Sequence, residues 1–288
     1  MRYKLAMILL LLLFSAPVCF AQSAWTHITE INGEPLGRIE FIVRDSFGNM
    51  WVLDQTHRKL YQLQNEQWNV IPIDISLSDA VAGENGTMWF SGHDGLAKYS
   101  GQEFEYFLPD ALFLPRTSNN VIGIKSDGTV VVKGINGIVL FDGNEWQIIT
   151  VVNGLPTSSL FNIRVSPEDD IWCCFNDPFN GPEGIGAAKY DGSGFTRYNK
   201  QSGLLSDMVV DFAFAPNETV YLSYNSTWGG FSGGIMQYTN QTWSLLTDEF
   251  YGQDLAFDPR GNLWTAFRTL DEQYRVVNMA AVFDGTDW

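Results

Sequence analysis

Cysteine is scarce in this sequence: the 288 residues contain three, and two of them are neighbours. A disulfide between the adjacent Cys173 and Cys174 would have strained geometry, so we expect no disulfide framework. If both residues lie on one strand, alternation sends one thiol inward and the other outward. That arrangement leaves an intermolecular bridge through the outward thiol open.

Histidine is equally scarce, and none of His27, His57 and His93 has a second His or Cys at metal-ligand spacing. The sequence also lacks a nucleophile elbow, a phosphate-binding loop and a dinucleotide fingerprint. The acidic run from Glu168 to Asp170 falls in a predicted turn, which indicates a solvated loop. We therefore expect no metal, no cofactor and no catalytic residue, that is, a protein that is not an enzyme.

Long hydrophobic runs are absent except near the N-terminus, where Arg2 and Lys4 precede an apolar stretch from Leu5 to Phe14. The stretch is followed by a break and by "CFA" before Gln22, which predicts a secretory signal peptide over residues 1–21. The run is short for a membrane anchor, and the residues before Cys19 do not suit lipoprotein processing. We expect a periplasmic or secreted chain over residues 22–288, with no membrane span after cleavage.

Positive charge is also in short supply, with 17 Lys and Arg against 33 Asp and Glu and a formal net charge of −16. Signal cleavage would remove two of the basic residues and make the chain more acidic. A surface of this sign repels phosphate backbones and anionic membranes, so nucleic acid is excluded as a partner.

Aromatic residues, by contrast, are abundant and recur at regular intervals. The pattern of Gly, a small polar residue, a hydrophobe and Trp occurs in "DSFGNMW", "GENGTMW" and "DPRGNLW". The Trp position returns every 38 to 49 residues, as Trp51, Trp89, Val131, Trp172, Tyr221 and Trp264. A second aromatic, preceded by a tight-turn signature, follows in each copy, as Trp68, Phe104, Trp146, Phe195, Trp243 and Trp288.

Each copy has the length and the turn signals of four short antiparallel strands. Units of this size that cannot bury both faces alone stack radially, so the sequence predicts an all-β fold, a β-propeller of about six four-stranded blades over residues 22–288. We interpret Trp51, Trp89, Trp172, Tyr221 and Trp264 as structural side chains that fill the spaces between blades.

The two ends of the chain match as parts of one repeat. "WTHITEINGEP" from Trp25 aligns with "WQIITVVNGLP" from Trp146, which begins the fourth strand of a repeat. The last copy stops at Trp288, where its fourth strand should begin. We expect the N-terminal strand to close the ring, which removes exposed sheet edges. The alternative is a fragment of a longer chain with more blades.

The motifs "DSFGNMWVLD", "ENGTMWFSGHDGLAKYSGQEFEYF" and "VVNGLPTSS" resemble the two-component regulator propeller repeat, over nearly all of residues 25–288. The resemblance implies a periplasmic, sensor-like propeller that binds ligands, often glycans, and works with a membrane-bound signalling partner. The chain departs from that plan, since its sequence contains no kinase, no receiver segment and no apolar helix after the propeller.

The connection between the second and third strands is longer in the last three copies than in the first three. From the first aromatic to the second, the copies take 17, 15 and 15 residues, and then 23, 22 and 24. In a propeller these connections emerge on one face, and aromatic side chains beside planar polar groups suit glycan or peptide recognition. The candidate binding residues are Asp177, Phe179, Asn180, Trp228, Phe231, Arg268, Asp271, Tyr274 and Arg275.

The sequence therefore predicts an exported, non-enzymatic β-propeller that senses a ligand or binds a glycan, a peptide or a protein. Two alternatives stay open: a propeller lyase or hydrolase acting at the axial funnel, and the N-terminal fragment of a longer hybrid sensor kinase. The alternative for the long connections is that they are ordinary Gly-rich loops whose aromatic side chains pack against one another and bind no ligand.

Overall fold

The computed structural model describes residues 28–92, 95–107, 122–175, 185–225, 233–249, 251–270 and 276–288, without the side chains of residues 251–253, 268–270 and 276–278. The described chain is built of strands and three short 3-10 helices, η1 (Glu84–Gly86), η2 (Val151–Asn153) and η3 (Lys200–Ser202). None of the helices in these ranges is long and apolar enough to cross a membrane. The predicted signal peptide lies outside the described residues.

The chain divides into two units, residues 1–37 and residues 38–288. The first contains a small hairpin of β1 (Glu30–Ile31) and β2 (Glu34–Pro35). Its turn is made by Asn32 and Gly33, both with positive φ, which is the conformation that two-residue hairpin turns require. Trp25, where the predicted closing strand starts, lies outside the described residues, so closure of the ring stays a prediction.

The second unit contains six antiparallel sheets in chain order, which we call sheets 1 to 6. Sheets 1 to 3 contain β3 (Ile39–Arg44), β4 (Met50–Asp54), β5 (Lys59–Gln64) and β6 (Gln67–Ile71); β7 (Leu77–Ala82), β8 (Met88–Gly92), β9 (Gly95–Tyr99) and β10 (Phe104–Phe107); and β11 (Ile122–Ile124), β12 (Val130–Lys133), β13 (Ile138–Phe141) and β14 (Trp146–Ile149). Sheets 4 to 6 contain β15 (Leu160–Val165), β16 (Ile171–Phe175), β17 (Ala187–Tyr190) and β18 (Phe195–Tyr198); β19 (Met208–Phe214), β20 (Val220–Asn225), β21 (Gly233–Thr239) and β22 (Thr242–Thr247); and β23 (Tyr251–Phe257), β24 (Leu263–Leu270) and β25 (Val276–Phe283).

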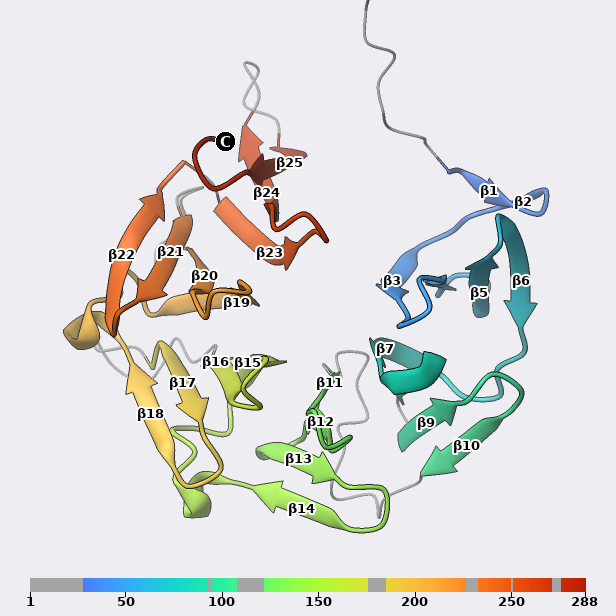
Figure 1. The fold of residues 1–288 in the computed structure, drawn as a ribbon, viewed down its shortest axis with the longest axis horizontal. Coiled ribbons are helices and arrows are strands. Elements are labelled where there is room, and N and C mark those ends of the chain that lie inside the picture. The colour runs from blue at the N-terminus through green and yellow to red at the C-terminus, as the bar shows by residue number, and fades with distance from the viewer. Residues whose placement is uncertain are drawn as a thin grey trace, which may run out of the picture. The chain divides into compact units, whose positions relative to one another are not determined.

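The six sheets follow one another around an axis, with the first strand of each sheet nearest to it (Figure 1). We call β3, β7, β11, β15, β19 and β23 the inner strands, and each contacts the next one along the chain. This arrangement confirms the predicted all-β, six-bladed propeller. The described part of sheet 6 has three strands, where the sequence predicts a fourth from the N-terminus.

The turn between the first and second strands is held by one carboxylate in sheets 1 and 6. Asp45 Oδ1 accepts the backbone N–H groups of Phe47 and Asn49, at 3.0 and 2.9 Å. Its Oδ2 accepts the Asn49 side chain and the Trp51 indole N–H, both at 2.9 Å. Asp258 repeats the same set of bonds, including one to Trp264 Nε1 at 3.2 Å. The repeated sequence motif is therefore a local hydrogen-bonded unit that fixes both the turn and the Trp.

The recurring aromatics pack between neighbouring sheets. Trp51 is completely buried and meets Phe90 and Tyr99 of sheet 2 edge-on, with ring centroids 6.0 and 5.4 Å apart. The ring centroid of Trp172 in sheet 4 lies 5.5 Å from that of Phe212 in sheet 5, with the two rings tilted by 54°. Truncating a buried aromatic of this kind costs roughly 3–5 kcal/mol, so these contacts are a main source of the propeller's stability.

The expectation that one thiol of the Cys173–Cys174 pair faces outward is wrong, because both side chains are fully buried. Cys173 packs in the cluster between sheets 3 and 4, and Cys174 in the cluster between sheets 4 and 5. Their strand, β16, has a neighbouring sheet on each side, so alternation sends each thiol into a different core. Burial raises the pKa of both thiols, which leaves no outward thiolate for an intermolecular bridge.

Candidate functional site

A β-bulge interrupts the inner strand of five sheets, at the step before Phe41, Asp79, Asn162, Asp211 and Asp254. Bulges re-aim side chains, and the residue after the bulge is polar in four of these sheets. Each of the five stands ten residues before the first recurring aromatic of its repeat, which lies on the second strand. The sequence analysis missed these polar residues, although that fixed spacing is a signal that could have found them.

The residues after the bulge tie neighbouring sheets together. Asp79 Oδ2 accepts the backbone N–H of Ile122, on the next inner strand, at 3.1 Å. Asp211 Oδ2 accepts the backbone N–H of Leu255 in the same way, at 3.0 Å. The Asn162 amide donates to the Val210 carbonyl at 3.3 Å. These side chains provide hydrogen-bond partners for backbone groups of the neighbouring inner strands.

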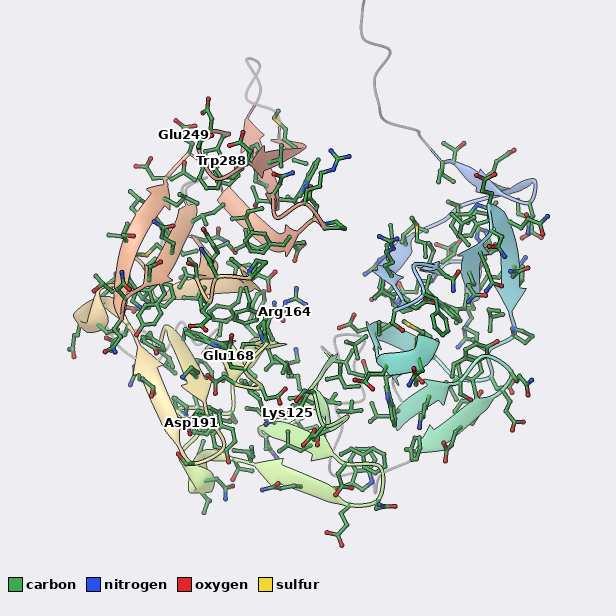
Figure 2. All side chains as sticks on the ribbon, viewed as in Figure 1. Lys125, Arg164, Glu168, Asp191, Glu249 and Trp288 are labelled. Atoms are coloured by element: carbon green, nitrogen blue, oxygen red, sulfur yellow. The ribbon has the colours of Figure 1, made fainter. Side chains whose placement is uncertain are left out.

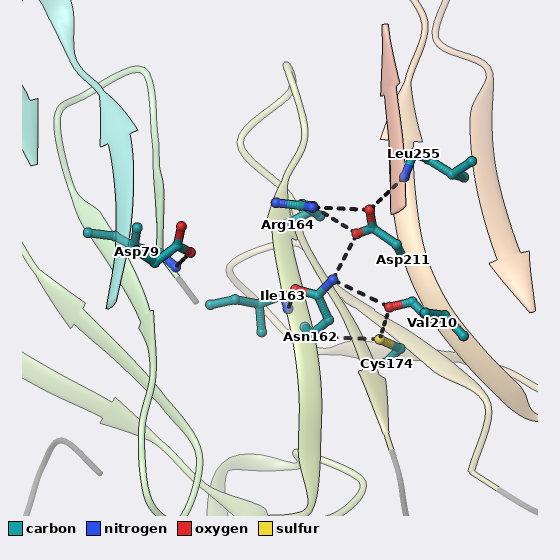
Figure 3. A network of polar contacts seen from close by, with 9 residues as sticks. Asp79, Asn162, Ile163, Arg164, Cys174, Val210, Asp211 and Leu255 are labelled. Atoms are coloured by element: carbon teal, nitrogen blue, oxygen red, sulfur yellow. Dashed lines mark hydrogen bonds and ion pairs between the residues drawn. The ribbon is translucent and has the colours of Figure 1, made fainter. Parts of the chain in front are cut away.

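Arg164 and Asp211 form the centre of this polar network (Figure 3). The Arg164 Nε and Nη2 donate to the two oxygens of Asp211 at 2.8 and 3.0 Å. The Asn162 amide also donates to Asp211 Oδ1, at 2.8 Å. The Asp211 side chain is fully buried, whereas the Arg164 side chain is 37% exposed. The pair therefore has a buried end between the sheets and a cationic end that solvent reaches.

The charges around Arg164 are unbalanced in favour of carboxylates. Burial alone would lower the pKa of Arg164, but Asp211, Asp79 and Asp254 together raise it. Burial raises the pKa of Asp79 to about 6, against the lowering effect of its hydrogen bonds and of Arg164. Desolvation by the surrounding protein and the negative charge of Asp211 raise the pKa of Asp254, against the lowering effect of Arg164. Arg164 is thus fixed as a cation, while two of its acidic neighbours are held partly toward the neutral form.

In sequence, the nine predicted binding residues fall between β16 and β17, between β20 and β21, between β24 and β25, or within β24 itself. Eight lie outside the described residues: Asp177, Phe179, Asn180, Trp228, Phe231, Asp271, Tyr274 and Arg275. Arg268 belongs to β24, where its backbone pairs with Tyr251 and Asn278, but its side chain is not described. Their grouping stays a prediction.

Of the three histidines, His57 is described, and its Nδ1 lies 2.8 Å from an oxygen of the buried Asp54 in the turn after β4. His27 and His93 lie outside the described residues. Within the part of the chain that the structure describes, no three His, Cys, Asp or Glu side chains gather closely enough to hold a metal ion.

Comparison with known proteins gives no family assignment from sequence, because no protein-family model matches and no curated protein matches. Solved structures do match. Virginiamycin B lyase from Staphylococcus aureus is 11% identical with a TM-score of 0.61, over 84% of this chain and 83% of that one. YCF48 bound to a D1 peptide is 14% identical with a TM-score of 0.58, over 87% of this chain and 79% of that one.

A third similar structure is the extracellular domain of a protein described as a hybrid two-component system from B. thetaiotaomicron. It is 14% identical with a TM-score of 0.63, over 90% of this chain but only 34% of that one. This chain therefore spans about a third of that extracellular domain. At such identities the likenesses show the fold alone: a β-propeller shared with sensor domains, a lyase and a peptide-binding protein.

Proposed function

We propose that this chain is an exported, non-enzymatic β-propeller that binds a glycan, peptide or protein ligand as a sensor-like module. The likeness in fold to extracellular domains of hybrid two-component systems supports a sensing role. A membrane-bound signalling partner is part of the proposal, because the resemblance to the two-component regulator propeller repeat implies one. Export by a cleaved signal peptide over residues 1–21 belongs to it too.

The observation that carries the proposal is how the axial carboxylates are used. Asp211 accepts hydrogen bonds on both oxygens from Arg164, Asn162 and the Leu255 N–H. Asp79 accepts the N–H groups of Ala80 and Ile122. Groups engaged in this way hold sheets together, and a general acid or base needs a proton-transfer path that such bonds occupy. The axis therefore favours a scaffold for binding over a catalytic centre.

Arg164 supplies a recognition group on that scaffold. A guanidinium has five N–H donors, and Asp211 takes two of them, on Nε and Nη2. The remaining donors belong to a side chain that is more than a third exposed. A fixed, planar donor of this kind suits a carbonyl, a hydroxyl or a carboxylate of a ligand. The proposal adds the long connections of sheets 4 to 6, which the sequence predicts to emerge on one face, with Trp228 and Tyr274 as their main contacts.

The test is a glycan and peptide array probed with purified residues 22–288, followed by calorimetry on any ligand found. We expect Trp228→Ala and Tyr274→Ala each to weaken binding at least tenfold. Phe47→Ala removes an aromatic that is 71% exposed on a turn between first and second strands, and serves as the matched control. Unchanged affinity in both loop variants would refute the loop assignment, and a chain that binds nothing on either array would refute the function.

A lyase acting at the axial funnel is the second candidate, because virginiamycin B lyase and this chain each cover more than four fifths of the other. Incubation with quinupristin, which a neighbouring structure contains, separates the two functions. Conversion of quinupristin into a product, detected by mass spectrometry, would establish the lyase. Recovery of intact quinupristin, with saturable binding of an array ligand, supports the binding module.

A further inference from the structure

Arg164 brings unused hydrogen-bond donors to the axis. Its guanidinium carries five N–H donors, and Asp211 takes one on Nε and one on Nη2. Within the described residues, Arg164 makes no other hydrogen bond and no other ion pair. Figure 2 shows Arg164 on the axial side of sheet 4, and its side chain is 37% exposed. A ligand at the axis can therefore reach the remaining donors.

Glu40, on the inner strand of sheet 1, brings an unused acceptor. Its side chain is 7% exposed, and its Oε2 is buried without a hydrogen bond. The ionic contact of Glu40 within the described chain is Arg38 Nη2, at 3.2 Å, from a side chain that is 70% exposed. A buried carboxylate oxygen without a hydrogen-bond donor is rare in native proteins and costs stability. Glu40 therefore indicates a donor that comes from outside the chain.

Asp79, on the inner strand of sheet 2, adds a second carboxylate close to Glu40. Burial is the main reason that the pKa of Asp79 is raised to about 6, and the charge of Glu40 raises it further, whereas Arg164 opposes the rise. The two oxygens of Asp79 accept the N–H groups of Ala80 and Ile122, one each. A carboxylate has about four lone-pair sites, so Asp79 keeps acceptor capacity on both oxygens.

Arg164 and Asp79 face each other without pairing. Figure 3 shows the guanidinium between Asp211 on one side and Asp79 on the other. Each of these two charges shifts the pKa of the other, yet within the described residues no ion pair joins them. Asp254 acts on Arg164 from sheet 6 in the same way, also without a described ion pair. The axis thus holds a cation and carboxylates that attract one another at a separation too large for direct contact.

A ligand with a single charge would use only part of this set. A lone anion would reach Arg164 among carboxylates that repel it, and a lone cation would leave the guanidinium donors unused. A zwitterion matches both signs, since its carboxylate accepts from the guanidinium and its ammonium donates up to three hydrogen bonds. In a free α-amino acid the two groups are attached to one carbon, so one compact ligand meets both.

We infer that the axis binds a free α-amino acid as a zwitterion, with the ligand carboxylate on Arg164 and the ligand ammonium between Glu40 and Asp79. This inference rests on the sensing role proposed above and names a small ligand for it. The axial residues that it uses are independent of Trp228 and Tyr274.

The first test compares three forms of one amino acid on the mature chain, residues 22–288. The free protein amino acids are screened by thermal shift, and the affinity of those that stabilise the chain is measured by calorimetry. The methyl ester of the same amino acid keeps only the ammonium, and its N-acetyl form keeps only the carboxylate. We expect saturable binding of at least one free amino acid and an affinity at least tenfold lower for both blocked forms.

Variants of the chain test the contacts. We expect Glu40→Gln and Asp79→Asn each to weaken the binding of the free amino acid at least tenfold. Glu249→Gln is the matched control, because it removes an exposed carboxylate that Figure 2 shows away from the axis. Circular dichroism and thermal unfolding verify that each variant is folded.

Proton release separates a ligand contact from a structural role. An ammonium beside Asp79 favours the ionised carboxylate, so binding near pH 6 should release protons, and the affinity should rise between pH 5 and pH 7. The charged groups that act on Asp79 are Glu40 and Arg164, and Arg38 pairs with Glu40. Calorimetry in two buffers of different ionisation enthalpy measures the release, which Asp79→Asn should abolish.

No binding of any free amino acid, equal affinity for either blocked form, or unchanged affinity in Glu40→Gln or Asp79→Asn would each overturn the inference. If a ligand found on the arrays still binds and Trp228→Ala weakens it, the proposed function stands without the axial site. If neither the amino acids nor the arrays show binding, both fail.

Discussion

Arg164 and Asp211 join sheets 4 and 5 through two parallel hydrogen bonds of 2.8 and 3.0 Å, with the carboxylate fully buried and the guanidinium partly open to the axis. The same carboxylate accepts the Leu255 N–H, so a single side chain links the inner strands of three consecutive sheets. A propeller depends on such links because each sheet contacts only its two neighbours.

Asp211→Ala should therefore destabilise the protein strongly. The substitution leaves a charged Arg164 and a buried backbone N–H without their acceptor, and breaking a buried pair in this way costs about 3 kcal/mol. Partial exposure of Arg164 places the cost at the low end of the usual range. Urea unfolding followed by tryptophan fluorescence measures it. The double variant Asp211→Ala/Arg164→Ala should lose less than the two single losses combined, and strict additivity would refute the coupling.

The Asp258 turn predicts a loss of stability in acid. Hydrogen bonds from Asn262, Trp264 and Arg260 lower the pKa of Asp258 to about 2, below its usual value of 3.8. A depressed folded-state pKa contributes stability above the unfolded-state value, and that stability is lost as the pH falls from about 4 through 2. Asp258→Asn should unfold at a lower temperature than the wild type at pH 6, with the difference shrinking toward pH 2. A constant difference across this range would contradict the assignment.

Asp79 predicts the opposite dependence. Burial raises its folded-state pKa to about 6, so ionisation opposes folding, and the penalty grows as the pH rises from about 4 through 6. The charges near it are Glu40, which adds to the penalty, and Arg164, which reduces it. Asp79→Asn should gain stability relative to the wild type as the pH is raised from 4 to 8. Thermal unfolding across that range measures the trend, and a difference that falls with pH would refute it.

The fold was predictable from sequence because its signals are local. The bonds from Asp45 to Asn49 and Trp51 span four and six residues, so turn, Gly and Trp appear together as a motif. The axial network was not predicted because its bonds are distant, as with the 44 residues between Asp211 and Leu255. The bulge before Asp211 also breaks the simple alternation from which facing is inferred. The two buried thiols were misjudged for a related reason, since a strand between two sheets has no outward face.

Gly86 shows how tightly neighbouring turns approach each other. It has φ +74°, its N–H donates to Ser46 Oγ at 2.7 Å, and a Cβ there would lie 2.2 Å from the Phe47 ring of sheet 1. Gly86→Ala should therefore cost more than the roughly 1–2 kcal/mol of a left-handed alanine alone. Gly128→Ala is the matched control, because Gly128 has φ +86° and nothing within 4 Å of its Cβ position. Equal losses of unfolding free energy in the two variants would show that Phe47 yields without cost.

Closure of the ring by the N-terminal strand is the remaining prediction. One row of paired residues crosses sheet 1: Ile42, Val52, Tyr61 and Val70. The equivalent residues of sheet 5 are Phe212, Leu222 and Met236, and they pack in the core that sheet 5 shares with sheet 4. Ile42 is 64% exposed, whereas Phe212 is 1% exposed. If the strand from Trp25 completes sheet 6, that sheet has four strands, as the other blades have, and can pack against the row of sheet 1.

In that case Trp25→Ala should lower the unfolding free energy by roughly 3–5 kcal/mol, as for other buried aromatics. Gln22→Ala, three residues earlier, should leave it unchanged. Hydrogen exchange provides the direct readout: slow exchange at Thr26 and Ile28 in the wild type, lost in Trp25→Ala, supports closure, and fast exchange in both proteins refutes it.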